Sequence, residues 1–317
     1  LLIIYAAYRY TKTRIILLMR LKTEHEQRVN MENMNQQKIN FFTYISHDLK
    51  TPLTLILSPL QRLIQQPQIS NNDKEKLEVI YRNANRMNYL INELLTFSKI
   101  EMKQMHISVR KGDIMHFLEE LSHIFDIVAG EREIDFIVSL EDTKEEVWFS
   151  PSKLERILYN LLSNAFKYTQ PGGYVRLSAK LIKEEKETMV QISVKDSGRG
   201  IPKDVQEQIF ESYYQVEKRD HREGFGLGLS LTRSLIHMHK GEIRVESEVN
   251  KGSDFIVTLN VSEDAYAPDE RSSENITTEE IQKYNQRIKE TIELIPEKLT
   301  NKEKDSGRES IMIVEDN

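Results

Sequence analysis

Two apolar stripes at helical spacing are the feature that most constrains the fold of this chain. The segment between them, QQPQISNND, is rich in turn-forming residues, so the stripes predict an antiparallel hairpin of two helices. A hairpin alone cannot bury both stripes, and we therefore expect two copies to pair as a homodimer with a four-helix bundle. The stripes consist of Phe42, Ile45, Leu49, Leu53, Ile56, Leu60 and Leu63, then Leu77, Ile80, Ala84, Met87, Ile91 and Leu94.

Composition excludes several classes of function. The 317 residues are 39% hydrophobic and 30% charged, which is typical of globular modules joined by polar helices. The net charge of -6 and the lack of a basic block argue against direct contact with nucleic acid. The absence of cysteine excludes disulfides, thiolate catalysis and cysteine-based metal sites.

The first residues, LLIIYAAY, are apolar and are followed by Arg9, Lys12 and Arg14. We interpret residues 1–8 as the cytoplasmic end of a transmembrane helix, since a full span needs roughly 20 residues and basic residues favour the inside. Residues 9–38 are then a juxtamembrane linker helix. A short apolar helix packed elsewhere is the alternative. In both cases we expect a longer protein.

The character of the chain changes after Lys99, where β-rich segments alternate with helical ones. DFIVSL, YVRLSAKLI, MVQISVKD, EIRVESE and DFIVTLN are predicted strands, the last two as a hairpin. Helices are predicted at Pro151–Tyr168, Lys203–Tyr214 and Leu229–Met238. The fold class is therefore a helical hairpin domain at 39–101 followed by a mixed α/β domain at 109–262.

The residues after the α/β domain are polar and charged. Thr277 and Glu280 have the spacing of a capping box ahead of a charged helix, and residues 263–309 are predicted to be a linker. The last residues, 310–317, contain IMIVEDN, a buried-strand pattern that ends in two acids.

The first candidate reactive residue is His47, in YISHDLKTPL. At 100° per residue its side chain falls roughly 165° from the centre of the apolar stripe, and so it faces solvent. Pro52 removes one helical hydrogen bond just after it. Asp48 is a candidate to orient the imidazole, and Thr51 on the same face could position a water. A merely solvated histidine is the alternative.

The second candidate lies on the predicted helix SPSKLERILYNLLSNAFKYT. Beside its apolar stripe, Asn160, Asn164, Lys167 and Tyr168 share one edge. Two amides, a cation and an aromatic ring can together hold Mg²⁺, phosphate oxygens and a base. An ordinary polar helix face is the alternative.

Two glycine turns follow. In VKDSGRGIP, Asp196 ends a strand and could accept a hydrogen bond from an exocyclic amine, while Gly198 and Gly200 allow close backbone approach. In GFGLGLSL, glycines precede a helix and could cradle phosphates. The segment before it, with Lys218, Arg219 and Arg222, is equally consistent with a mobile lid and with a solvated surface.

In this order the motifs resemble a sensor histidine kinase over about residues 41–259. The matching segments are an H box from His47, an N box from Asn160, a G1 box from Asp196, an F box around IFESYYQ and a G2 box from Gly224. The resemblance implies an α/β sandwich ATP-binding domain of the histidine kinase and Hsp90-like type. It also implies autophosphorylation of His47 and transfer of the phosphoryl group to a receiver aspartate, with possible phosphatase activity at Thr51.

The resemblance also assigns roles to the site residues. Asn164, with Asn160, would bind Mg²⁺, Lys167 would contact phosphate, Tyr168 would contact adenine, and Asp196 would read the adenine amine. The residues that would shape the site and its lid are Gly198, Gly200, Phe210, Gly224, Gly226, Leu227 and Gly228.

IMIVEDN resembles the first strand of a receiver domain, in which Glu315 and Asp316 would hold Mg²⁺. We therefore expect a hybrid kinase with a receiver fused on the same chain, of which this is the cytoplasmic portion of a bacterial inner-membrane protein. The alternative for IMIVEDN is a buried strand or tail. For the whole chain, the alternatives are an ATP-binding scaffold without kinase activity and an ATPase or chaperone.

Overall fold

The computed structural model describes residues 5, 9, 12, 14, 17–20, 22–23, 31, 34, 44–45, 48–66, 69–102, 104–185, 187–214 and 226–292, with the last three as backbone only. Within these residues, no helix combines the length and apolarity that a bilayer crossing requires. Tyr5 is the one described residue of the predicted transmembrane end, and it is helical. His47, Gly224, Lys218, Arg219, Arg222, Glu315 and Asp316 lie outside the described residues.

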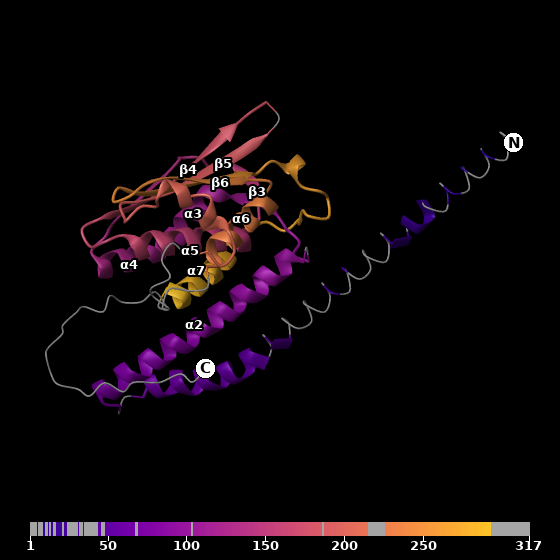
Figure 1. Ribbon diagram of the computed structural model, residues 1–317. Helices are drawn as coiled ribbons and strands as arrows, with labels where there is room; N and C mark the ends of the chain where they lie inside the picture. Colours follow the sequence, from indigo (N-terminus) through magenta and orange to yellow (C-terminus); the bar gives the residue numbers. More distant parts are fainter. Residues whose placement is uncertain are drawn as a thin grey trace.

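The predicted helical hairpin is observed. Residues 48–64 are helical, and α2 (Asn71–Glu101) returns beside them (Figure 1). Ser70 caps α2, since its Oγ accepts the N–H of Asp73 at 3.2 Å. Leu53 on the first arm packs with Ala84 and Ile91 on α2. This apolar contact holds the two arms together.

The second domain is built on a five-stranded sheet with strand order β2-β4-β5-β7-β6. β2 runs parallel to β4, and all other neighbours are antiparallel. A smaller antiparallel pair joins β1 to β3. The strands are β1 (Arg110–Asp113), β2 (Asp135–Leu140), β3 (Glu146–Phe149), β4 (Tyr174–Lys183), β5 (Thr188–Asp196), β6 (Glu242–Glu248) and β7 (Gly252–Asn260).

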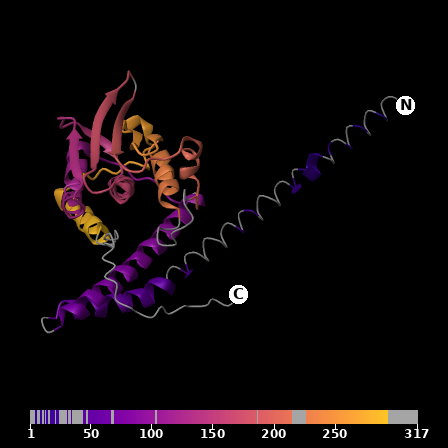
Figure 2. The ribbon, with the colours of Figure 1, turned by 60° about the vertical axis from the view of Figure 1, so that its left-hand side comes forward.

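Helices cover one face of this sheet, which makes a two-layer α/β sandwich (Figures 1 and 2). Burial alternates along β5, as expected when one face of a strand meets the helices and the other is more open. The covering helices are α3 (Ile114–Ser122), α4 (Ile124–Arg132), α5 (Pro151–Tyr168) and α6 (Gly228–Met238). The fold class, a helical hairpin followed by a mixed α/β sandwich, is confirmed.

The prediction of a helix at 203–214 is wrong. The segment forms two short 3-10 turns, η1 (Lys203–Val205) and η2 (Gln208–Phe210). The side-chain amide of Gln206 donates to the carbonyl of Ser247 at 2.8 Å and so fastens the segment to the end of β6. Ile209 and Phe210 are both buried. Tertiary contacts therefore override the helical pattern here.

The segment after the sheet packs on the same domain. η3 (Glu263–Ala265) leads to an extended stretch beside β1, where Val109 forms a bridge with Arg271. α7 (Thr278–Ile292) then lies against α3, α4 and α5. The described part of the predicted linker is thus ordered on the domain surface.

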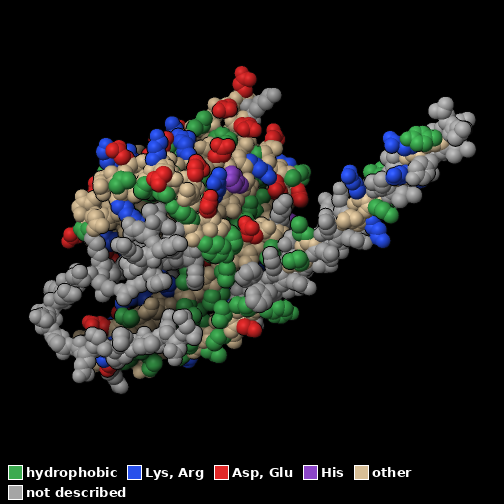
Figure 3. All heavy atoms as spheres, in the orientation of Figure 1, with side chains coloured by type: hydrophobic (Ala, Val, Ile, Leu, Met, Phe, Trp, Pro, Cys, Tyr) green, Lys and Arg blue, Asp and Glu red, His purple; other side chains and the backbone are tan. Residues whose placement is uncertain are grey.

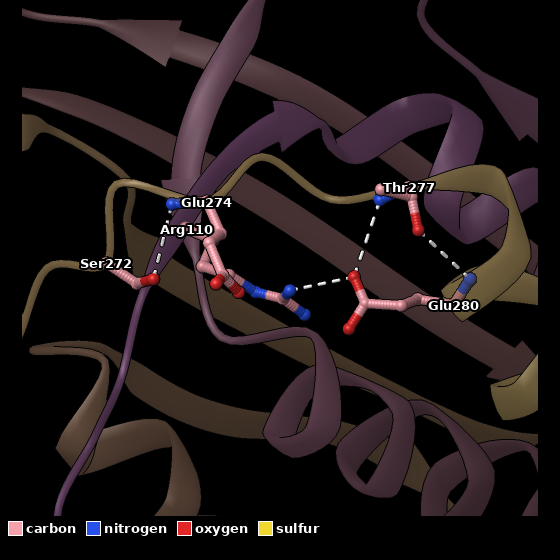
Figure 4. A network of polar contacts seen from close by, with 5 residues as sticks. All are labelled: Arg110, Ser272, Glu274, Thr277 and Glu280. Carbon is pink, nitrogen blue, oxygen red and sulfur yellow. Dashed lines mark hydrogen bonds and ion pairs between the residues drawn. The ribbon is translucent and has the colours of Figure 1, made fainter.

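The start of α7 is fixed by the predicted capping box (Figure 4). Glu280 donates its N–H to Thr277 Oγ1 at 3.3 Å, and Thr277 donates its N–H to Glu280 Oε2 at 3.4 Å. The same carboxylate accepts a 2.7 Å hydrogen bond from Arg110 Nη1 on β1. Just upstream, Ser272 Oγ accepts the N–H of Glu274 at 3.3 Å. This network joins α7 to the small sheet.

Replacing Ile288 with Ala should destabilise the α/β domain by about 2–4 kcal/mol, because Ile288 on α7 is buried in the core of this domain and the smaller side chain leaves a cavity. The single tryptophan, Trp148 on β3, provides the fluorescence signal for urea unfolding. The matched control is Gln282→Ala on the exposed face of α7, which should change stability by at most about 0.5 kcal/mol. Equal effects of both variants would show that α7 is not part of the domain core.

Candidate functional site

Helix α5 presents the predicted polar edge because the apolar face beside this edge is buried. Each residue of the core stripe is at most 3% exposed, so the helix cannot rotate without exposing a large apolar area. Pro151 stands at the first helical position, as predicted. Ser150 stands at the N-cap position, where its side chain makes no capping hydrogen bond. The core stripe consists of Leu154, Ile157, Leu158, Leu161, Leu162 and Ala165.

Asn160 is buried between α5 and α6. Its Nδ2 donates to Thr232 Oγ1 at 2.6 Å, and the Thr232 hydroxyl donates to the carbonyl of Gly228 at 3.0 Å. A Cβ on Gly228 would lie 2.6 Å from Asn160 Oδ1. Glycine is therefore needed at the start of α6 for this close approach, and Asn160 Oδ1 faces the first turn of that helix.

Asn164 and the following residues continue the same edge toward the end of α5. Asn164, Lys167 and Tyr168 are half-buried. Lys167 Nζ donates to Tyr168 Oη at 3.1 Å and lies 4.8 Å from the centre of its ring. The edge therefore carries amide oxygens first and a cation with an aromatic ring at its end. Amide oxygens are hard ligands of the kind that Mg²⁺ accepts together with phosphate oxygens.

Asp196 ends β5 beside this edge and is buried. Its Oδ1 accepts N–H groups from Gly198 at 2.8 Å and from Ser253 at 3.3 Å. Burial raises the pKa of the carboxyl to about 6, while these two hydrogen bonds oppose the shift and nearby Asp254 adds to it. Both of these hydrogen bonds engage Oδ1, and Oδ2 is the second acceptor oxygen of the same carboxyl group.

Glycines bring the G1 turn close to α5 and β6. A Cβ on Gly198 would lie 2.6 Å from the carbonyl oxygen of Tyr168, the last residue of α5. Gly200 has a φ of +68°, and a Cβ there would collide with the carbonyl of Glu248. These contacts fix the turn against the aromatic end of the α5 edge.

The residues just before and just after the predicted lid contact each other. The N–H of Tyr213 donates to the carbonyl of Gly226 at 3.0 Å, and both residues have positive φ, 66° and 68°. Residues 215–225 between them are outside the described part of the chain. Phe210 and Leu227, predicted to shape the lid, are buried, and the ring of Phe210 packs edge-on against that of Phe255 with 6.4 Å between the ring centroids.

On the hairpin, Asp48 and Thr51 lie on the exposed side of the first arm. Both follow His47, the predicted phosphoacceptor, in the sequence. The structure thus brings together the N-box and G1-box residues, with Gly226, Leu227 and Gly228 beside them, while the hairpin residues form a separate surface.

Sequence reasoning missed a contact between the two domains. Arg156 on α5 donates to Thr96 Oγ1 on α2 at 2.7 Å. The rings of Tyr89 and Tyr159 meet edge-on at 6.0 Å, as do those of Phe97 and Tyr213. Aromatic residues on α2 outside its apolar stripe were the available signal.

The same contact encloses a carboxyl group. Glu93 accepts a hydrogen bond from Tyr89 Oη at 2.8 Å. Burial raises the pKa of Glu93, and the Tyr89 bond and the Arg156 charge partly oppose this rise. The interface between α2 and α5 therefore combines aromatic packing with a buried polar group.

Comparison with known proteins agrees with this arrangement. Residues 37–103 match the His Kinase A (phospho-acceptor) domain, and residues 149–263 match the histidine kinase-, DNA gyrase B- and HSP90-like ATPase family.

Among curated proteins, histidine kinase P4 of Formosa agariphila is 34% identical over 98% of this chain and 23% of its own length. Hybrid signal transduction histidine kinase D of Dictyostelium discoideum is 31% identical over 72% of this chain and 15% of its own length. The chain thus spans less than a quarter of the length of either relative.

Among solved structures, full-length ShkA in complex with AMPPNP has a TM-score of 0.60 at 24% identity, covering 70% of this chain and 46% of that one. This likeness concerns the fold. The two domain matches and the 34% identity to the Formosa agariphila kinase lead to one conclusion: the chain belongs to the histidine kinase family and contains its phosphoacceptor and ATP-binding domains.

Proposed function

We propose that this chain is the kinase core of a sensor histidine kinase, which uses ATP to phosphorylate His47 and then passes the phosphoryl group to a receiver aspartate. One observation carries the proposal. Asn160, Asn164, Lys167 and Tyr168 on one edge of α5 lie beside the buried carboxyl of Asp196, in a chain that also has the phosphoacceptor hairpin.

In the proposed reaction, a neutral imidazole nitrogen of His47 attacks the γ-phosphorus of ATP. The new bond is N–P, the bond to the β–γ bridging oxygen breaks, and ADP leaves. Such a transfer depends on positioning and charge stabilisation more than on covalent help from the protein. Asp48 is proposed to orient the ring through its other nitrogen, and Thr51 to position a water for hydrolysis of a phosphorylated receiver.

The nucleotide roles follow from the chemistry of each group. Asp196 Oδ2 is proposed to accept a hydrogen bond from the adenine amine, Tyr168 to pack on the base, and Lys167 to neutralise phosphate. Asn160 and Asn164 would hold Mg²⁺ through their amide oxygens, and the ion would stabilise charge on the phosphates. The glycines at 224, 226 and 228 and residues Phe210 and Leu227 are proposed to support the lid.

We propose a homodimer for the hairpin. Leu49, Ile56 and Leu63 are spaced seven residues apart and are 42%, 47% and 39% exposed, and on α2 Ile80 and Met87 are 49% and 53% exposed. Figure 3 shows hydrophobic side chains gathered along this part of the molecule. A second copy would cover this seam, as in a four-helix bundle.

The wider context is also proposed. A fused receiver is suggested by IMIVEDN and by the hybrid kinase of Dictyostelium discoideum. A membrane tether at residues 1–8, with this portion on the cytoplasmic side of a bacterial inner membrane, is suggested by the apolar start followed by basic residues.

Incubation with γ-labelled ATP and Mg²⁺ tests the proposed reaction. The wild-type dimer should acquire acid-labile, base-stable label, as expected for a phosphoramidate, and His47→Gln should acquire none. His106→Gln, at an exposed histidine outside the proposed site, should be labelled as the wild type is. A wild-type dimer that binds ATP but acquires no label would falsify the kinase reaction and favour the scaffold.

The variant Asp196→Asn should bind ATP more weakly without a loss of folding stability. Asparagine Oδ1 can still accept the two backbone N–H groups, but its NH₂ places a donor where the adenine amine needs an acceptor. We expect ATP affinity to fall about 10- to 100-fold at pH 7.5, measured by calorimetric titration.

The same variant should be at least as stable as the wild type at pH 7.5. Since burial raises the pKa of Asp196 to about 6, ionisation costs folding free energy that develops between about pH 4 and pH 6 and stays constant above. Asparagine removes that cost, which is up to about 3 kcal/mol. The difference in unfolding free energy between the variant and the wild type should vanish near pH 3. Unchanged ATP affinity in a stable variant would contradict the role of Asp196.

Ile56→Glu should dissociate the proposed dimer. Each dimer would bury two such charges, and at roughly 1.4 kcal/mol each the dissociation constant should rise at least about 100-fold. Sedimentation equilibrium measures it. Leu55→Glu is the matched control, because Leu55 is adjacent but 71% exposed and outside the seam. If only the Leu55 variant dissociates, the seam is misplaced.

A further inference from the structure

We infer that Arg199 is a further nucleotide-contacting residue, whose guanidinium stacks with Tyr168 and the purine base of the bound nucleotide. This inference rests on the proposed function, since it adds a residue to the same ATP site. Arg199 lies inside the G1 turn D-S-G-R-G, between Gly198 and Gly200.

The observation behind it is the surroundings of the Tyr168 ring. The Cζ atom of Arg199 lies 4.5 Å from the ring centroid, and Lys167 Nζ lies 4.8 Å from the same centroid. Lys167 also donates to the hydroxyl of Tyr168 at 3.1 Å. Two cations from different elements therefore hold one ring, which is the ring proposed to contact the base.

The backbone of Arg199 has little freedom to move away from that ring. Its carbonyl accepts the N–H of Asn250 at 2.7 Å. Gly198 touches the last carbonyl of α5, and Gly200 touches the carbonyl of Glu248, so closely that neither position has room for a Cβ. The turn is therefore fixed on both sides, and its geometry directs the Arg199 side chain to the end of α5.

Arg199 belongs to the base end of the site rather than to the phosphate end. It follows Asp196, the residue proposed to read the adenine amine, by three positions in the same turn. A guanidinium is planar and stacks on aromatic faces, and it does so on nucleobases as well as on phenol rings. A purine beside Tyr168 and within reach of Asp196 Oδ2 would therefore contact this guanidinium.

The test is binding of ATP, ADP and adenosine to the full chain and to Arg199→Ala, at 50 and 300 mM salt. Loss of a stacking cation should weaken the binding of ATP, ADP and adenosine by the same factor, about 3- to 30-fold, at both salt concentrations. Arg199→Lys keeps the charge but not the planar group, and it should recover little of the loss. The thermal midpoint without nucleotide should not change, because the side chain is exposed.

The matched control is Arg176→Ala on β4. The Cζ of Arg176 lies 6.0 Å from the ring of Tyr174, so this variant also removes an arginine from a tyrosine ring, but outside the site. All three affinities should equal those of the wild type.

Three results would overturn the inference. A loss that grows from adenosine to ATP and shrinks at high salt would assign Arg199 to the phosphates. Full recovery in Arg199→Lys would show that charge alone matters, and unchanged affinities in Arg199→Ala would show that there is no contact. If the wild type binds none of the three nucleotides, the proposed function fails, and this inference fails with it.

Discussion

Burial of one face of α5 against the sheet is the constraint on which the rest of the structure depends. Six aliphatic side chains on that face are almost fully buried, and each leucine or isoleucine among them contributes roughly 1.5–3 kcal/mol relative to exposure. With this face fixed, the edge from Asn160 to Tyr168 can point only toward α6 and the G1 turn. Close glycine contacts at Gly198 and Gly228 then bring those elements into reach. The site is therefore a consequence of core packing.

The other edge of α5 meets the hairpin. Arg156, about one turn before Asn160, and Tyr159, directly before Asn160, both contact α2. A single rigid helix thus carries both the groups proposed to hold ATP and the groups that dock the domain. Release of the hairpin would expose Glu93, whose pKa is raised by burial, so undocking would also favour its ionisation.

Local signals predicted much of this molecule. The strands and α5 were predictable because periodicity, a proline at the first helical position and glycine turns all act within a few residues. Helix 203–214 was mispredicted because Gln206 is held by Ser247, some forty residues away. Nor did the polar composition of α7 indicate that Ile288 and Tyr284 would pack on the α/β domain.

The sequence by itself determined the family, the two domains and the types of residue at the site, since ordered motifs carry that information without coordinates. Only the tertiary structure decided which groups face each other. It buried Asp196 and so raised its pKa, placed Arg199 on the ring of Tyr168, and docked α2 on α5. Burial, stacking and docking depend on residues far apart in the chain, and the spacing of residues along the sequence does not give their distances in space.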